Sequence, residues 1–263
     1  MFVEINFFLK IQPFANWYFP LVWFGYILLI DALVYKLKGS SLISNRFPQF
    51  FGMLILSVLI WWGFELINLA VKNWQYVGTA AMSEGSRLVM KNLAFATVAP
   101  AVMETAELLR TLHAFDHAYL KRKHKISKRF LHGMVELGIA ALILPFFFPA
   151  FTYPLVWTSF FLILDPINYL HRQPSMIQHV KDRKLAIPLT LMAAGIMCGF
   201  LWEFWNYWAV RKWVYEIPFV GFFKIFEMPL LGYMGYFPFA LELYAVYWFV
   251  RSLFVPKERL LSE

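Results

Sequence analysis

The stretch WGFELINLAVKNWQY at residues 62–76 recurs in altered form as LWEFWNYWAVRKWVY at residues 201–215. Each stretch carries a glutamate, an asparagine three residues later, and then a Trp-x-Tyr triplet. The two glutamates and the two asparagines match at an offset of 138, and one further residue is inserted before the second triplet. Polar residues repeated in this way within apolar sequence predict two copies of one structural unit.

The match continues on both sides of these stretches. FPLVW at 19–23 returns as YPLVW at 153–157, an offset of 134, and nine of the 24 positions from 20 to 43 agree with their counterparts. The other matched polar residues and prolines are Asp31 with Asp165, Pro100 with Pro238 and Glu104 with Glu242. Each copy therefore reads as a helix with an aspartate, a helix with Glu-x-x-Asn, a Trp-x-Tyr loop and a helix with Pro-x-x-x-Glu.

The composition indicates a membrane protein. Of the 263 residues, 60% are apolar and only 15% are charged, whereas soluble domains have about 45–50% and 25%. Aromatic residues make up 20% of the chain, more than interfacial belts alone explain, and a cavity for a long apolar ligand would account for the excess. The single cysteine, Cys198, excludes disulfides within the chain and cysteine metal clusters.

Seven stretches are long and apolar enough to span a membrane, which takes about 20 residues. They are residues 17–35, 49–71, 88–110, 132–150, 152–170, 186–209 and 228–251. With seven spans, 17 of the 24 Lys and Arg fall on one side, many of them in KRKHKISKR at 121–129. The positive-inside rule then predicts a multi-pass cell (inner) membrane protein with the N-terminus outside and the C-terminus in the cytoplasm. A patch that binds an acidic partner is the alternative interpretation of the basic run.

The expected fold class is all-α, with two parallel three-helix repeats and one linking helix. The expected domains are an interfacial N-terminal segment (1–16), the first repeat (17–112), a basic cytoplasmic loop with the linking helix (113–151), the second repeat (152–252) and a cytoplasmic tail (253–263). Three helices alone would invert the second copy, but the linking helix restores its orientation. The matched acids of the two copies can then face one another across a central cleft.

Ionisable side chains at depth in a membrane are costly and are therefore candidates for function. The candidate catalytic acids are Glu65, Glu203, Glu104 and Glu242. Asn68 and Asn206 lie on the same helical faces as Glu65 and Glu203, and we expect them to orient these carboxyls. The alternative is that the acids only join helices through interhelical hydrogen bonds.

Aromatic residues crowd around the candidate acids. The candidate substrate-binding residues are Trp62, Trp202, Trp213 and Tyr215, together with both asparagines. Aromatic faces stabilise a carbocation, and a buried carboxyl can stay protonated and donate a proton, so the set suits protonation of an alkene. An interfacial aromatic belt is the alternative. His113 and His117 share a helical face, but a solvated helix end explains them better than a metal site.

These motifs resemble the lycopene cyclase domain family of bacteria, archaea and fungi. The resemblance is carried by LWEFWNYWAVRKWVY, FEMPLLGY and FPFALELY in the second copy, and by WGFELINLAVKNWQY and APAVMETAEL in the first. It implies a membrane cyclase built from two small, related three-helix units. The family's Pro-x-Glu-Glu motif would fall at Pro229, where Leu231 and Gly232 replace the acids, and Glu227 is the candidate substitute.

The function expected from the sequence is isomerisation or cyclisation of a polyprenoid or carotenoid-like lipid. Glu203 or Glu65 would be the general acid, and Glu104 and Glu242 would stabilise the cation or take back the proton. We expect no cofactor, no metal and no nucleic acid, with membrane lipid as a partner and a homo-oligomer as an option. A proton-coupled transporter or lipid-handling protein with a central acidic cleft is the alternative, and a non-catalytic membrane scaffold is the third class.

Overall fold

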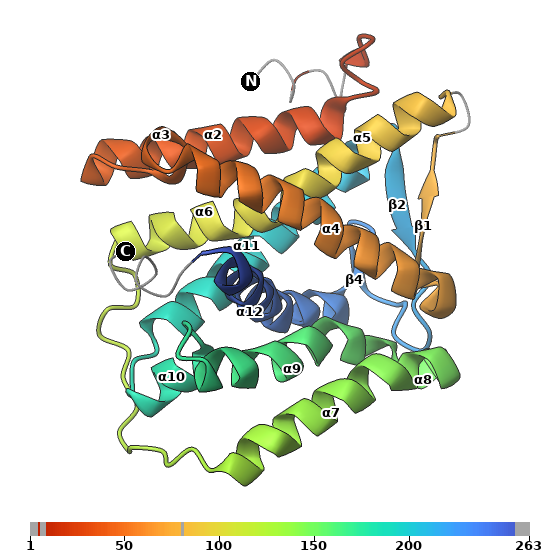
Figure 1. The fold of residues 1–263 in the computed structure, drawn as a ribbon. Helices are drawn as coiled ribbons and strands as arrows, with labels where there is room; N and C mark the ends of the chain where they lie inside the picture. Colours follow the sequence, from red (N-terminus) through yellow and green to blue (C-terminus); the bar gives the residue numbers. More distant parts are fainter. Residues whose placement is uncertain (1–4, 6–8, 80–81, 256–263) are drawn as a thin grey trace.

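A computed structural model of the chain describes residues 5, 9–79 and 82–255, and within these the fold is mostly helical (Figure 1). Much of the expected N-terminal segment and most of the expected tail lie outside the described residues. The long helices are α2 (Tyr18–Lys38), α4 (Phe47–Val71), α5 (Glu84–Ala96), α6 (Val98–Thr111), α7 (Lys128–Phe147), α9 (Val156–Leu170), α11 (Ala186–Trp208) and α12 (Tyr236–Phe254). The short helical elements are α3 (Leu42–Asn45), α8 (Pro149–Thr152), η1 (Tyr153–Leu155), α10 (Met176–Lys181) and η2 (Leu230–Gly235).

Five helical segments are long and apolar enough to cross a membrane, namely Tyr18–Lys38, Phe47–Val71, Lys128–Phe147, Pro149–Leu170 and Ala186–Trp208. They correspond to five of the seven predicted spans. Helix α4 illustrates why lipid is the natural surrounding, because Leu59, Leu66 and Leu69 are 63%, 65% and 72% exposed. Patches of exposed apolar side chains this large are unusual on soluble monomers. The chain is therefore a membrane protein by the character of its surface.

The third predicted span, 88–110, is broken into α5 and α6 at Thr97. Ser57 of α4 enters the break: its hydroxyl donates to the Phe95 carbonyl at 2.5 Å and accepts from the Ala99 N–H at 3.0 Å. In a regular helix these two backbone groups would bond to each other. Pro100 adds to the break because it has no N–H for the Ala96 carbonyl. A side chain inserted in this way is a recognised cause of a helix kink.

The seventh predicted span, 228–251, begins eight residues later than expected, at Tyr236. The preceding residues form the short strand β4 (Met228–Pro229), which pairs with β3 (Lys224–Ile225), and then η2. Proline and glycine explain the delay, since Pro229, Gly232 and Gly235 are poor residues for a helix interior. Pro238 is accommodated because it lies in the first turn of α12, where its missing N–H would have no helical partner.

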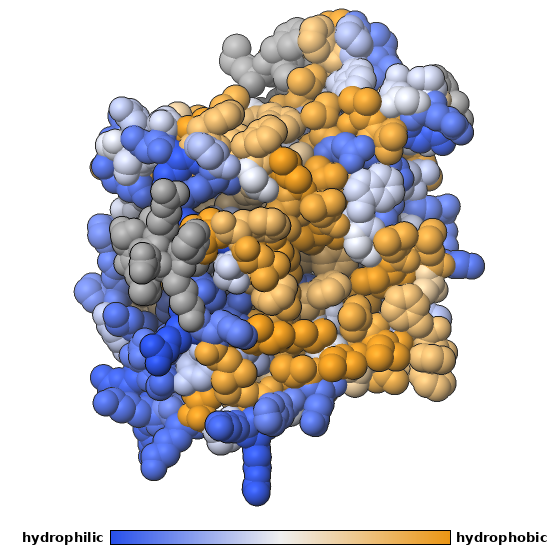
Figure 2. Space-filling model, viewed as in Figure 1, coloured by the Kyte–Doolittle hydropathy of each residue, from blue (hydrophilic) through white to orange (hydrophobic). Residues whose placement is uncertain are grey.

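The loops gather at two opposite ends of the helices (Figure 1). At one end, strand β1 (Trp74–Val77) pairs with β2 (Lys212–Tyr215) in an antiparallel ribbon. At the other end, Tyr119 bridges to Lys184, so the loops after α6 and α10 meet there. Figure 2 shows hydrophobic residues over the middle of the molecule and hydrophilic residues mainly towards its edges, including the end that carries α3 and α10.

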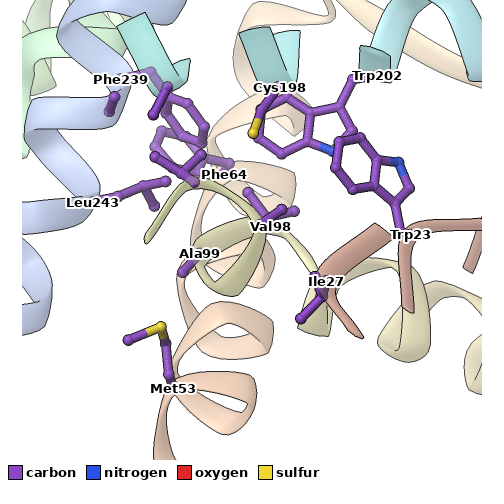
Figure 3. Close-up of a cluster of buried hydrophobic side chains, with 14 of the residues drawn as sticks. Trp23, Ile27, Met53, Phe64, Val98, Ala99, Cys198, Trp202, Phe239 and Leu243 are labelled. Atoms are coloured by element: carbon purple, nitrogen blue, oxygen red, sulfur yellow. The ribbon is translucent and has the colours of Figure 1, made fainter. Parts of the chain in front are cut away.

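The core joins the two halves of the chain through aromatic side chains (Figure 3). Trp23 of α2 packs against Trp202 of α11, with ring centroids 5.2 Å apart. Trp157 of α9 stacks on Phe64 of α4 at 5.0 Å. Each contact therefore links the first helix of one predicted copy to the second helix of the other.

Helix α12 lies close against α11 because glycines face it. A Cβ on Gly195 would lie 2.4 Å from the Tyr236 carbonyl oxygen, and one on Gly199 would lie 2.3 Å from the Tyr236 ring. Small residues four apart are a common way for membrane helices to approach closely. The two glycines thus place the Tyr236 side chain directly beside α11.

Candidate functional site

The two Trp-x-Tyr triplets lie opposite each other in the ribbon. Trp74 pairs with Tyr215 and Tyr76 pairs with Trp213, because the strands are antiparallel. The pairing brings into contact segments that are about 140 residues apart in the chain. An interfacial aromatic belt is the alternative explanation of these tryptophans. The strand pairing shows that both also belong to the two-stranded ribbon.

Asn68 and Asn206 hold the ribbon in place and do not hold the acids. The Asn68 amide donates to the Trp74 carbonyl at 2.8 Å, and its oxygen accepts from the Asn73 N–H at 2.9 Å. The Asn206 amide donates to the Trp213 carbonyl and accepts from the Trp213 N–H, both at 2.9 Å. The expectation that these amides orient the carboxyls is therefore wrong. The side-chain amide satisfies backbone groups just beyond the helix end, where no intrahelical partner exists.

Glu203 is completely buried in α11, with an exposed fraction of 0%. Its Oε1 accepts hydrogen bonds from the hydroxyls of Tyr215 and Tyr236, both at 2.7 Å. The Trp213 indole N–H donates in turn to the Tyr215 oxygen at 2.8 Å. Within the described residues, Oε2 has no hydrogen-bond partner. The residues that orient this acid are thus two tyrosines, of which Tyr236 was not predicted.

Glu65 has a matching but more polar environment. Its Oε1 accepts from the Trp74 indole at 2.9 Å and from the Tyr76 hydroxyl at 2.8 Å. Lys91 of α5 lies 3.5 Å from Oε2 and also 4.2 Å from the centre of the Tyr76 ring. A cation therefore accompanies Glu65, whereas no salt bridge to Glu203 occurs in the part of the chain that the structure describes.

The phenols beside the acids remain protonated. Burial raises the pKa of the Tyr76 and Tyr215 hydroxyls well above the usual tyrosine value, and the neighbouring Glu65 and Glu203 raise it further. Both effects disfavour a second negative charge at the same place. At physiological pH each phenol therefore keeps its proton and donates a hydrogen bond to the neighbouring carboxyl group.

A cavity of about 360 Å³ lies beside the ribbon, within the size range of ligand pockets. Its wall is largely aromatic and includes Trp61, Trp157, Trp202, Tyr236 and Phe239. The side chains that bond the two acids line it as well, namely Trp74, Tyr76, Trp213, Tyr215 and Tyr236. None of the four candidate carboxyls is among the lining residues. The expectation that the four acids meet at one cavity is therefore corrected, because tyrosine and tryptophan side chains stand between the cavity and Glu65 and Glu203.

Glu242 and Glu104 occupy helix contacts away from the cavity wall. Oε1 of Glu242 accepts from the Phe160 N–H near the start of α9 at 2.8 Å. Glu104 is 1% exposed, and neither of its carboxyl oxygens has a hydrogen-bond partner within the described residues. For Glu242, a hydrogen bond between helices accounts for the position of the carboxyl. This agrees with the alternative that the acid only joins helices.

The matched aspartates fasten the short helices at the other end of the molecule. Asp31 accepts from the Ser41 hydroxyl and the Ile43 N–H, both at 2.8 Å. Asp165 accepts from the N–H groups of Met176 and Ile177 at 2.7 and 3.0 Å. Both aspartates hold the N-terminal turn of the following short helix, which explains why they are repeated.

The remaining predicted residues divide between the cavity and its surroundings. Trp202, Trp213 and Tyr215 line the cavity, whereas the Trp62 indole donates to Asn92 at 3.0 Å and its neighbour Trp61 lines the cavity instead. Glu227 forms an ion pair with Lys212. No group of three or more His, Cys, Asp or Glu that could hold a metal ion occurs among the described residues.

Sequence reasoning missed several cavity residues, which are Tyr236, Trp157, Phe239, Arg87, Lys91 and Arg211. One had a usable signal: Trp157 is the last residue of the repeated YPLVW and matches Trp23. Tyr236 had none, because the matching position in the first half is Val98.

The asparagine clamps can be tested by mutation. Asn206→Ala leaves the Trp213 N–H and carbonyl without their partner, so we expect a loss of about 1–3 kcal/mol in unfolding free energy. Asn68→Ala should have a similar effect. Asn92→Ala is the matched control, because it removes a half-buried bond to Trp62 and an exposed bond to the Leu88 carbonyl but no bond to the ribbon backbone. Thermal unfolding in detergent measures all three, and equal destabilisation by Asn206→Ala and Asn92→Ala would contradict the clamp.

A comparison of the chain with protein families, with characterised proteins and with solved structures finds no match. The function is therefore argued from the geometry of the site.

Proposed function

We propose that the chain is a membrane enzyme that isomerises or cyclises a polyprenoid or carotenoid-like lipid by proton transfer. The observation that carries the proposal is the bonding of Glu203. Two phenols donate to one oxygen of this buried carboxyl, and both belong to residues that line an aromatic cavity. Proton exchange between Glu203 and a bound chain would therefore run through Tyr215 or Tyr236.

The proposed reaction consumes no redox equivalent. For the reaction, the phenol hydroxyl turns from Glu203 to a double bond of the lipid and its oxygen accepts a hydrogen bond from the protonated Glu203. Glu203 then gives its proton to the phenol oxygen as the phenol gives its own proton to the double bond, which leaves a carbocation. The cation then either loses a proton from the adjacent carbon or is attacked by a second double bond before losing it. The proton returns through the phenol to the Glu203 carboxylate, so the product is an isomer of the substrate.

The cavity wall suits such a cation. Trp202 and Trp157 present large aromatic rings there, and aromatic faces attract positive charge. Burial of the Glu203 carboxyl also supports its role, because a group shielded from water exchanges protons only with the groups it contacts. Glu65, with Lys91 beside it, is assigned the supporting electrostatic role and not that of acid.

A lipid-handling protein is the second candidate, and one observation favours it. The carboxyls stand behind the aromatic wall and do not line the cavity themselves. A protein that only binds and releases a lipid would need that wall but would not need proton transfer.

The proposed topology has seven crossings, with α5 and α6 together as the third and α12 as the seventh. It is supported by the two sets of paired loops, since β1 with β2 and Tyr119 with Lys184 occupy opposite ends. The two three-helix repeats are proposed to be parallel, in keeping with their equivalent asparagine and aspartate bonds. The basic end would then be cytoplasmic and the ribbon and cavity would face outward.

Cysteine labelling tests this topology. In a background where Cys198 is replaced by alanine, a cysteine at Lys123 should react with a membrane-impermeant maleimide only after the cells are opened, while a cysteine at Glu84 should react in intact cells. The positive-inside distribution is the physical reason. Reaction of both positions from the same side would rule out seven crossings.

The reaction is tested by deuterium incorporation. The purified protein in detergent is incubated in deuterated water with unlabelled lycopene or an unlabelled acyclic polyprenol, and the isomerised lipid is analysed by mass spectrometry. The wild type should add one deuteron per turnover. Glu203→Gln keeps the shape and an acceptor oxygen but removes the transferable proton, so turnover should fall by about 100-fold or more.

Glu242→Gln is the matched control, because Glu242 is also a fully buried glutamate but bonds no cavity residue. It should keep near-normal turnover. Full activity in Glu203→Gln would exclude Glu203 as the acid. Lipid binding without turnover in the wild type would favour the lipid-handling candidate.

A further inference from the structure

Four cations line the same aromatic cavity. Arg87 and Lys91 lie one turn apart on α5, and Arg211 and Lys212 lie next to each other at the start of the second ribbon strand. Residues four apart share one helical face, so both α5 cations can point to the cavity together. A purely hydrocarbon ligand gives no reason for four positive charges at the edge of an apolar pocket.

The lysines of this group have acidic partners within the protein. Lys91 lies 3.5 Å from Glu65, and Lys212 forms an ion pair with Glu227. The two arginines differ from them. No salt bridge to Arg87 or Arg211 is formed by any residue that the structure describes, and Arg87 Nε, Arg211 Nε and Arg211 Nη1 are buried without a hydrogen-bond partner there.

Buried guanidinium N–H groups without an acceptor are costly, and such exceptions call for an explanation. The planar fork of a guanidinium matches the oxygens of a phosphate or carboxylate, which it can bind with two parallel hydrogen bonds. Two such forks line one cavity, one on α5 and one just before strand β2 of the ribbon. Together they provide N–H donors that have no acceptor among the described residues, to which a single anion can bind.

We infer that Arg87 and Arg211 bind the anionic head group of an amphiphilic lipid whose apolar chain lies along the aromatic wall. The head group is of the phosphate class, and the chain is an isoprenoid. The isoprenoid assignment rests on the proposed function, whereas the anion site rests on the arginines alone. The inference narrows the substrate from polyprenoids in general to those that carry a phosphate or diphosphate.

Binding measurements on the full chain in a non-ionic detergent test the inference. The probes are farnesyl diphosphate, farnesol, inorganic phosphate and a short-chain phosphatidylglycerol. Tryptophan fluorescence and calorimetry measure the affinity of the protein for each probe. The wild type should bind farnesyl diphosphate at least tenfold more tightly than farnesol. Raising the salt concentration should reduce this difference, because the added affinity is electrostatic.

The variants are Arg87→Gln, Arg211→Gln and the double variant. Each single substitution should lower the affinity for farnesyl diphosphate at least tenfold and change the affinity for farnesol by no more than about twofold, both relative to the wild type. Lys224→Gln is the matched control, because Lys224 is an exposed cation of the same loop region that does not line the cavity. Arg211→Lys should recover part of the loss, because it restores charge without the fork. Farnesol binding reports that each variant is folded.

Equal affinity of the wild type and the double variant for farnesyl diphosphate would overturn the inference. If inorganic phosphate binds as tightly as farnesyl diphosphate, the ligand of the site is a free anion and not an amphiphilic lipid. Phosphatidylglycerol that competes equally well would assign the site to bilayer lipid and overturn the isoprenoid substrate. The outcome is separable from the proposed reaction: loss of farnesyl diphosphate binding in the arginine variants supports the anion site even if Glu203→Gln keeps full turnover.

Discussion

The pairing of the two Trp-x-Tyr loops is the constraint on which the rest of the site depends. Each loop leaves the end of a long helix, and an asparagine of that helix fixes its first backbone groups. With both loops fixed, their strands pair in the register that places Trp74 beside Tyr215 and Tyr76 beside Trp213. The register turns the tyrosine hydroxyls of the ribbon towards the two matched glutamates, and it closes one side of the cavity.

The aromatic core follows from the same arrangement. Trp23 packs on Trp202, and Trp157 packs on Phe64, so each half contributes its first helix to the other half's glutamate helix. Neither half can then bury its aromatic face alone. The surroundings of the two glutamates differ in ways that matter for chemistry, because Tyr236 donates to Glu203 whereas Lys91 accompanies Glu65. We assign the acid to Glu203 and the supporting charge to Glu65 on the basis of this asymmetry.

The sequence was sufficient to predict the membrane class, five of the spans, and the matched glutamates beside aromatic residues. These features depend on local apolar length and on repetition, which are visible in a single chain. It was insufficient where a distant residue decides the structure. The break at Thr97 depends on Ser57 of another helix, and the role of the asparagines depends on where the loop after each helix turns. The arginines of the cavity were counted only as loop charges, because nothing local distinguishes a cation that lines a pocket from one that faces solvent.

The central claim is that the aromatic cavity beside the ribbon holds a lipid chain. Mass spectrometry of lipids that remain bound to the protein purified in mild detergent tests it most directly. Gly235 lines the cavity, and its backbone has ordinary helical angles with no atom closer than 3.9 Å to an added Cβ, so Gly235→Phe should fill the space without disturbing the fold. We expect a prenyl or polyene lipid on the wild type and on Glu203→Gln, and none on Gly235→Phe. Absence of such a lipid from the wild type, or its undiminished presence on Gly235→Phe, would contradict it.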